Sequence, residues 1–190
     1  MELDKPVVSF ANPDEWEAWL EEHHETSTGV WIRMARKSSG IASIDWAGAL
    51  QVALCFGWID GQRRSHDDTS FLQKFTPRTK KSPWSKINVG HVERLIAAGR
   101  MRPAGHAAID AAKADGRWER AYGSHSTIEV PADFQAALDA RPGAAAFFAT
   151  LGSTARFPFL YRIQDAKRPE TRAKRITEYA DLLAAGKTLR

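Results

Sequence analysis

Hydrophobic and polar residues follow one another in the N-terminal half of the chain in patterns that predict short strands between helices. β-Branched and aromatic residues at 6–10 and 30–35 are typical of strands. Two further runs, 58–66 and 69–75, meet at an Asp-Asp pair and predict an antiparallel hairpin. We therefore expect a small, mainly antiparallel sheet in this half.

Helix signals separate the predicted strands. Asn12, followed by Pro13 and by Glu15, has the pattern of a capped helix start. Asp45 is in position to cap a second helix, which Gly57 ends in a left-handed conformation. The Ser-Pro-Trp-Ser segment at 82–85 predicts the cap and first turn of a third helix.

From residue 103 onward strand signals almost vanish and helical periodicity dominates. The expected helices span residues 103–114, 131–139, 142–151, 154–166 and 168–185. Pro158 must begin or kink the fourth of them. The sequence therefore predicts the α+β class: an α+β region at 1–102 that holds the aromatic and basic motif, and an all-helical C-terminal half at 103–190 packed on it as one compact unit.

Composition sets limits on the class of protein. The chain has 190 residues with 43% hydrophobic and 26% charged content, as ordinary globular proteins do. No apolar stretch approaches the roughly 18–20 residues that span a bilayer, and the N-terminal residues show no signal segment, so we expect a cytoplasmic protein. One cysteine excludes an intramolecular disulfide and a multi-thiolate zinc site. We expect neither a metal nor a cofactor.

The net charge of +4 conceals an asymmetry along the chain. Residues 1–60 hold 4 Lys/Arg and 10 Asp/Glu, whereas residues 61–102 hold 10 and 3. Either the acidic and basic parts neutralise each other, or the basic part forms a cationic surface that concentrates an anionic partner.

The first candidate group lies on the strand at 58–66. Trp58 and Asp60 point to the same face because alternate strand residues share a face. A carboxylate beside an indole can be desolvated, which raises its pKa and suits acid–base catalysis. The structural alternative is that Asp60 pairs with Arg63 or closes a turn at Asp60-Gly61. A ligand contact, which would also include Arg64, is the third interpretation.

The second candidate group leads into the helix expected after residue 82. Cations and hydroxyl groups just before a helix N-terminus favour an anion, because the free amides there add positive potential. Arg78 would be the bidentate anchor for a phosphate or carboxylate, unless it ties its loop to Asp60. The other predicted ligand contacts of this group are Lys81, Trp84, Ser85 and Asn88.

The third candidate group lies on the last helix. Arg168, Arg172 and Arg175 share one face at spacings of four and three residues. They either form a solvated charged face or extend an anion-binding surface.

Four ordered motifs resemble the YdeI/OmpD-associated family. They are Cys-Phe-Gly-Trp-Ile-Asp-Gly at 55–61, Phe-Thr-Pro-Arg at 75–78, Trp-Ser-x-x-Asn at 84–88 and Ala-Lys-Arg-Pro-Glu-Thr-Arg at 166–172. The resemblance spans nearly the whole chain. It implies bacteriocin or cationic-peptide protection and association with an outer-membrane porin, and some relatives are described as periplasmic. It implies no catalytic residues, cofactor or reaction.

We expect a protein that binds an anionic partner through the basic and aromatic surface of residues 58–88. An anionic small molecule, a nucleic acid or an acidic protein would each fit such a surface. The alternative is a small enzyme in which Asp60 is the general acid or base and Arg63, Arg78 or Asn88 orients the substrate. A third interpretation is an interaction module whose seven tryptophans fill the core.

Overall fold

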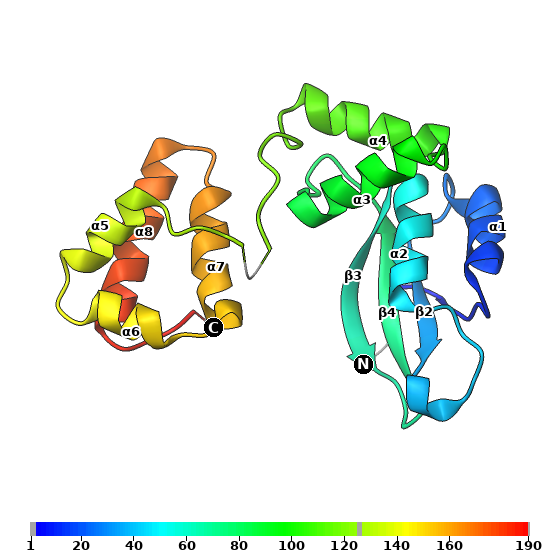
Figure 1. The fold of residues 1–190 in the computed structure, drawn as a ribbon, viewed down its shortest axis with the longest axis horizontal. Helices are drawn as coiled ribbons and strands as arrows, with labels where there is room; N and C mark the ends of the chain where they lie inside the picture. Colours follow the sequence, from blue (N-terminus) through cyan, green and yellow to red (C-terminus); the bar gives the residue numbers. More distant parts are fainter. Residues whose placement is uncertain (1–2, 125–126, 190) are drawn as a thin grey trace. The chain divides into compact units, whose positions relative to one another are not determined.

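The computed structural model describes residues 3–124 and 127–189 (Figure 1). Residue contacts divide the chain into two compact units. Unit 1 comprises residues 1–84 and 88–120, and unit 2 comprises residues 85–87 and 121–190. The division after residue 120 differs from the predicted boundary at 102/103, because the helix that begins at Pro103 belongs to unit 1. That the two regions form one compact unit stays a prediction.

Unit 1 contains a four-stranded sheet with the order β1-β2-β4-β3. The strands are β1 (Val7–Val8), β2 (Val30–Ala35), β3 (Trp58–Ser65) and β4 (Ser70–Pro77). β1 runs parallel to β2, and the other neighbours are antiparallel. The α+β class and a mainly antiparallel N-terminal sheet are therefore found as the sequence indicated.

The first two helices are α1 (Pro13–His23) and α2 (Trp46–Cys55). Both begin at the caps that the sequence predicts. Asn12 Oδ1 accepts a hydrogen bond from Glu15 N at 3.0 Å, and Asp45 Oδ1 caps α2 with a bond of 2.7 Å. Gly57 follows α2 with a φ of 72°, a conformation that a residue with a Cβ adopts only with strain.

Aromatic rings fill the core of unit 1. Trp16 of α1 is fully buried, and its ring centroid lies 6.1 Å from that of Trp58 and 5.8 Å from that of Phe75. Trp58 and Phe75 belong to the adjacent strands β3 and β4, so these three rings join α1 to the sheet. Large aromatic side chains dominate the hydrophobic stabilisation of a core of this size.

A short 3₁₀ helix, η1 (Lys37–Ser39), follows β2, and α4 (Pro103–Ala114) packs against the C-terminal end of α2. The contact with α2 depends on a glycine: a Cβ on Gly105 would lie 2.2 Å from the Cys55 carbonyl oxygen and 2.5 Å from Met101 Cε. Cys55 is buried, and this burial raises the pKa of its thiol.

α3 (Lys86–Ala97) begins later than predicted. The Ser82 hydroxyl accepts a hydrogen bond from the Thr79 amide at 2.9 Å instead of capping a helix. Arg117 donates to the carbonyl oxygens of Thr79 and Ser82 at 3.3 and 3.0 Å. A side chain distant in sequence therefore helps to hold residues 79–82 in a turn.

The helices of unit 2 are α5 (Ala132–Asp139), α6 (Ala144–Thr150), α7 (Ser153–Gln164) and α8 (Pro169–Ala184). Each contributes to one buried core. Ring centroids of Phe134 and Phe148 are 5.7 Å apart, and those of Phe159 and Tyr179 are 5.4 Å apart. Pro158 lies inside α7 and does not begin it.

The prediction of an all-helical C-terminal half is wrong. Tyr122 forms an isolated parallel β-bridge with Ser85, and its carbonyl oxygen accepts from Lys86 N at 2.8 Å. The described residues between α4 and α5 contain no α-helix. Gly116, Gly123 and Pro131 lie in this stretch, and both residue types disfavour helix. The strands themselves all lie in the N-terminal part of the described chain.

Replacing Gly105 by alanine should lower the free energy of unfolding by about 1–3 kcal/mol, because the new methyl group would overpack the contact between α2 and α4. Urea denaturation followed by circular dichroism measures the change.

Gly90→Ala is the matched control. Gly90 lies within α3, and the closest atom to an added Cβ there, outside the helix's own backbone, is 3.7 Å away. This substitution should stabilise by about 0.5–1 kcal/mol, because alanine loses less conformational entropy than glycine in a helix. Equal effects of the two substitutions would show that the close approach at Gly105 is not the cause.

Candidate functional site

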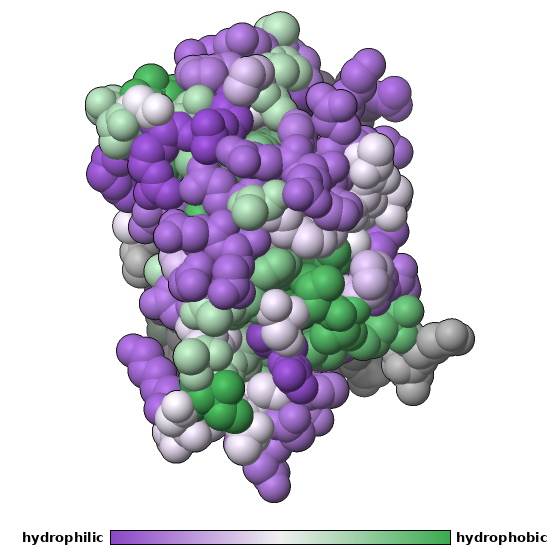
Figure 2. Space-filling model, turned by 90° about the vertical axis from the view of Figure 1, so that its right-hand side faces the viewer, coloured by the Kyte–Doolittle hydropathy of each residue, from purple (hydrophilic) through white to green (hydrophobic). Residues whose placement is uncertain are grey.

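Exposed large hydrophobic side chains are few among the described residues. The molecular face in Figure 2 is mostly hydrophilic, with a smaller hydrophobic area. The exposed large hydrophobic residues are Val7, Ile41, Trp46, Ile87 and Ile96. Single exposed apolar residues are common on protein surfaces, but Trp46, with 42% of its surface exposed, lines a pocket.

This pocket, which we call the Trp46 pocket, has a volume of about 640 Å³. It lies in unit 1, where the end of β2, the segment after β2, the first turn of α2 and the β3–β4 hairpin come together. The lining residues are Met34, Ala35, Arg36, Lys37, Ser38, Asp45, Trp46, Ala47, Arg63 and Phe71. Of the candidate residues from the sequence, Arg63 is in this pocket.

Three cations line the Trp46 pocket. Arg36, Lys37 and Arg63 form no ion pair with any carboxylate of the described residues. The Arg63 guanidinium carbon lies 3.7 Å from the centroid of the Phe71 ring, which holds that side chain by a cation–π contact. Asp45 also lines the pocket, but one of its oxygens caps α2.

The indole of Trp46 is held by Asp60. Trp46 Nε1 donates a hydrogen bond to Asp60 Oδ2 at 3.1 Å, which fixes the edge of the ring. Asp60 is half-buried on β3 and does not line the Trp46 pocket. Its predicted pairing with Arg63 or Arg78 is not found among the described ion pairs; its observed partner is an indole.

The two indoles of the predicted ligand surface are buried. Trp58 is 1% exposed and Trp84 is 2% exposed. Trp58 belongs to the ring cluster around Trp16, and the Trp84 ring centroid lies 4.9 Å from that of Trp118. Both rings therefore belong to the core of unit 1 and present no face to a ligand.

The Arg78 side chain contacts residues of its own loop, Trp84 and Pro83. Its guanidinium carbon lies 3.6 Å from the centroid of the Trp84 ring, and its Nη1 donates to the Pro83 carbonyl oxygen at 3.0 Å. Arg78 is half-buried, whereas Lys81 is exposed on the turn after it. Arg78 therefore organises its own loop, and Lys81 lies on that loop outside the Trp46 pocket.

Arg63 and Arg64 lie on opposite faces of the sheet. Arg63 pairs with Gln73 and Arg64 with Leu72, and side chains of neighbouring strand residues alternate between faces. The Arg64 guanidinium carbon lies 5.1 Å from the centroid of the Trp31 ring. The irregular register between Asp60 and Arg63 is a β-bulge, which the sequence did not reveal.

Ser85 and Asn88 lie at the start of α3. Ser85 forms the β-bridge with Tyr122 and belongs to unit 2, whereas Asn88 lies in the first turn of α3 and belongs to unit 1. The two residues, predicted to contact one ligand, therefore fall in different units.

The three arginines of α8 belong to unit 2. Arg172 donates from Nε and Nη2 to the two oxygens of Asp133 at 2.8 and 2.7 Å, and from Nη1 to the Ile163 carbonyl oxygen at 3.0 Å. Arg175 donates to the Arg162 carbonyl oxygen. Arg168 is exposed and forms no ion pair with another described residue.

The described residues contain neither a metal-binding cluster nor a membrane-spanning helix. Within residues 3–124 and 127–189, no three His, Cys, Asp or Glu side chains are arranged to hold a metal ion. None of the described helices combines the length and the apolar composition that a bilayer-spanning segment needs.

Comparison with known families gives two matches. Residues 8–108, more than half of the chain, match the family described as Domain of unknown function (DUF8412). Residues 127–186 match the family described as Bacteriocin-protection, YdeI or OmpD-Associated. The chain belongs to the DUF8412 family and carries a YdeI/OmpD-associated domain. No curated protein and no solved structure gives a significant match.

The four motifs that suggested this resemblance divide between the two matches. Only the motif at 166–172 lies in the YdeI/OmpD-associated domain. The motifs at 55–61, 75–78 and 84–88 lie in the DUF8412 domain. The YdeI/OmpD-associated match therefore covers the C-terminal part of the chain, not nearly all of it as the sequence resemblance suggested.

The residues of the Trp46 pocket that sequence reasoning missed lie in the segment after β2 and in the first turn of α2. No role in a site was predicted from the sequence for Arg36, Lys37 or Trp46. The sequence did contain one signal: the basic residues Arg36 and Lys37 precede a predicted helix that begins with an aromatic residue, Trp46.

Arg172→Ala should destabilise the YdeI/OmpD-associated domain by about 1–2 kcal/mol. The substitution removes the bidentate ion pair with Asp133 and the hydrogen bond to the Ile163 carbonyl oxygen. Both side chains of the pair are partly exposed, so solvent screening keeps the effect modest. Thermal unfolding followed by circular dichroism measures the change, and Arg168→Ala, on the same helix, should have almost no effect.

The effect of Arg172→Ala should depend on pH. The Arg172 guanidinium lowers the pKa of Asp133 below its usual value. The stability that the pair contributes is therefore complete above the unfolded carboxyl pKa of about 3.9 and is lost as the pH falls through the lower pKa of the folded state. A difference between Arg172→Ala and the unmodified chain that persists undiminished at the acid end would contradict this assignment.

Proposed function

We propose that the DUF8412 domain binds a small anionic ligand with a flat ring, of the nucleotide class, in the Trp46 pocket. The observation behind this proposal is the set of three cations, Arg36, Lys37 and Arg63, that have no acidic partner among the described residues beside an exposed indole. With Asp45 counted, the pocket lining holds three cations and one carboxylate, a net formal charge of +2, and a net positive surface concentrates anions.

The geometry supports both parts of such a ligand. Arg36 and Arg63 offer planar guanidinium groups that bind phosphate or carboxylate oxygens in bidentate fashion, and Lys37 adds a compact charge. Trp46 offers a ring face, and stacking of a base on an aromatic side chain is worth about 1–3 kcal/mol. The pocket volume of about 640 Å³ lies within the roughly 300–1,000 Å³ usual for small-molecule sites.

Asp60 has the role of a positioning residue in this proposal. Its Oδ2 accepts the hydrogen bond from Trp46 Nε1 and so fixes the plane on which the ligand ring would stack. The enzyme alternative, in which Asp60 is the general acid or base, has no support from this pocket, because Asp60 does not line it. The family description attaches bacteriocin protection to the type of domain in unit 2, and the ligand proposed for unit 1 is independent of that role.

Isothermal titration calorimetry with ATP, pyrophosphate and adenosine tests the proposal. ATP should bind most tightly, because pyrophosphate lacks the ring and adenosine lacks the charge. The affinity for ATP should fall as NaCl is raised, since partly exposed charges are screened. An oligonucleotide that binds more tightly per site than ATP would favour nucleic acid and overturn the small-ligand proposal.

The double substitution Lys37→Ala/Arg63→Ala should weaken ATP binding by about tenfold or more, which corresponds to about 1.4 kcal/mol. Lys80→Ala/Lys81→Ala is the matched control, because it removes the same charge from exposed positions outside the pocket. Equal losses in both double variants, or no ATP binding by the unmodified protein, would rule out the Trp46 pocket as the site.

A further inference from the structure

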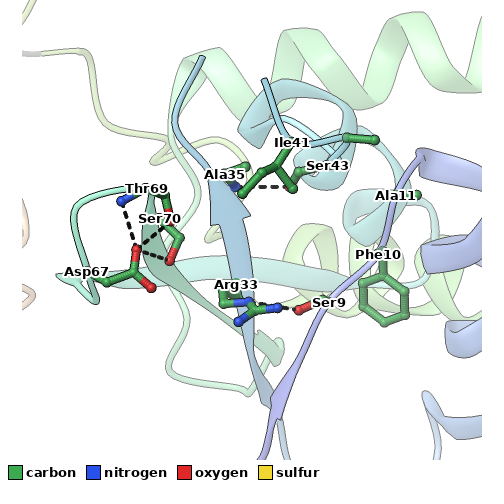
Figure 3. Close-up of a pocket in the computed structure, with 11 residues that line it drawn as sticks. Ser9, Phe10, Ala11, Arg33, Ala35, Ile41, Ser43, Asp67, Thr69 and Ser70 are labelled. Atoms are coloured by element: carbon green, nitrogen blue, oxygen red, sulfur yellow. Dashed lines mark hydrogen bonds between the residues drawn. The ribbon is translucent and has the colours of Figure 1, made fainter. Parts of the chain in front are cut away.

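A second pocket of unit 1 contains a cation and an anion that are not paired with each other (Figure 3). It has a volume of about 290 Å³ and includes Arg33 of β2 and Asp67 of the β3–β4 turn. We call it the Arg33 pocket. Arg33 and Met34 are adjacent on β2 and point to opposite faces of the sheet. Arg33 and Met34 therefore line different pockets on the two faces, and Ala35 at the end of β2 borders both pockets.

The hydroxyl groups around this pocket are already engaged by the protein. Ser9 Oγ accepts from Arg33 Nε at 3.2 Å. Ser43 Oγ accepts from Ala35 N and donates to the Ile44 carbonyl oxygen, both at 3.1 Å. These bonds hold Ser9 and Ser43 in place beside the two charged groups.

Asp67 offers one free oxygen. Its Oδ1 accepts three hydrogen bonds, from Thr69 N at 2.8 Å, Thr69 Oγ1 at 2.8 Å and Ser70 Oγ at 2.9 Å (Figure 3). Its Oδ2 has only the more distant His66 Nε2, at 3.7 Å. The hydrogen bonds from Thr69 and then Ser70 lower the pKa of Asp67 to about 2, so the carboxylate is ionised at neutral pH.

Arg33 offers the outer edge of its guanidinium. Ser9 holds Nε, and neither terminal nitrogen has a hydrogen bond or ion pair with another described residue. In Figure 3 the guanidinium and the Asp67 carboxylate lie on different walls of the pocket. They do not form an ion pair with each other, because no oxygen of Asp67 lies within 4.0 Å of a nitrogen of Arg33.

We propose that the Arg33 pocket binds a free α-amino acid with an apolar side chain. The ligand carboxylate would take the outer edge of Arg33, and its ammonium group would take Asp67 Oδ2. Phe10 and Ile41 also line the pocket and give the side chain an apolar wall. A ligand with only one charge meets one attractive and one repulsive wall, so the pocket selects for a zwitterion.

The size of the pocket agrees with a ligand of this kind. A volume of about 290 Å³ is at the lower limit of the roughly 300–1,000 Å³ that drug-sized ligands occupy. The Trp46 pocket is more than twice as large.

Titration of L-leucine, 4-methylpentanoate and 3-methylbutylamine, followed by NMR shifts of the backbone amides, tests the proposal. The two analogues keep the side chain and each lacks one charged group. Leucine should bind and shift amides of the segments around Ser9, Arg33 and Asp67. Each analogue should bind at least about tenfold more weakly.

Arg33→Gln and Asp67→Asn should each weaken leucine binding by about tenfold. Asparagine keeps an acceptor for Thr69 and Ser70, so the turn stays formed while the negative charge is lost. Arg63→Gln, which alters the other pocket, should leave leucine binding unchanged. Failure of leucine to bind at about 10 mM, or equal binding of leucine and 4-methylpentanoate, would overturn the proposal.

Discussion

The antiparallel pairing of β2 with β4 fixes which side chains reach each face of the sheet, and both candidate sites depend on it. One register aligns Met34 with Phe71 and Arg33 with Leu72. Met34 and Phe71 thereby line the Trp46 pocket, while Arg33 lines the pocket on the other face. A slip of one residue would exchange the two faces, so both sites require this single alignment.

Tryptophan has two separate roles in unit 1. Trp16, Trp58 and Trp84 are buried and stabilise the fold, and the cation that stacks on Trp84, Arg78, is held by the same core. Trp46 is different because Asp60 fixes its edge while much of its surface stays exposed. The aromatic and basic segment that dominates the sequence is thus mostly structural, and the exposed ring lies on a helix before it.

Local signals in the sequence predicted local structure well. Asn12, Asp45 and Gly57 mark helix ends because caps and left-handed glycines act over three or four residues. The helix start expected at 82–85 failed because Arg117 binds that turn from a distant part of the chain. Sequence spacing correctly aligned Trp58 with Asp60, but it could not tell which face of the strand is buried.

The candidate sites depended on long-range pairing, which explains why sequence reasoning found little of them. Arg172 looked available for a ligand, but its partner Asp133 lies 39 residues earlier in the chain. Arg36 and Lys37 come from the segment after β2 and Arg63 comes from β3, and the sheet brings these two segments together.

The chain passes between the units more than once, since residues 85–87 belong to unit 2 although they interrupt the sequence of unit 1. Neither unit is therefore one continuous stretch of polypeptide. A fragment that stops at residue 120 would keep Ser85 but lose Tyr122, its bridging partner. The bridge extends the N-terminal segment beyond the end of the first family match at residue 108, and a cut between Tyr122 and residue 127 would keep both the bridge and the two family matches whole.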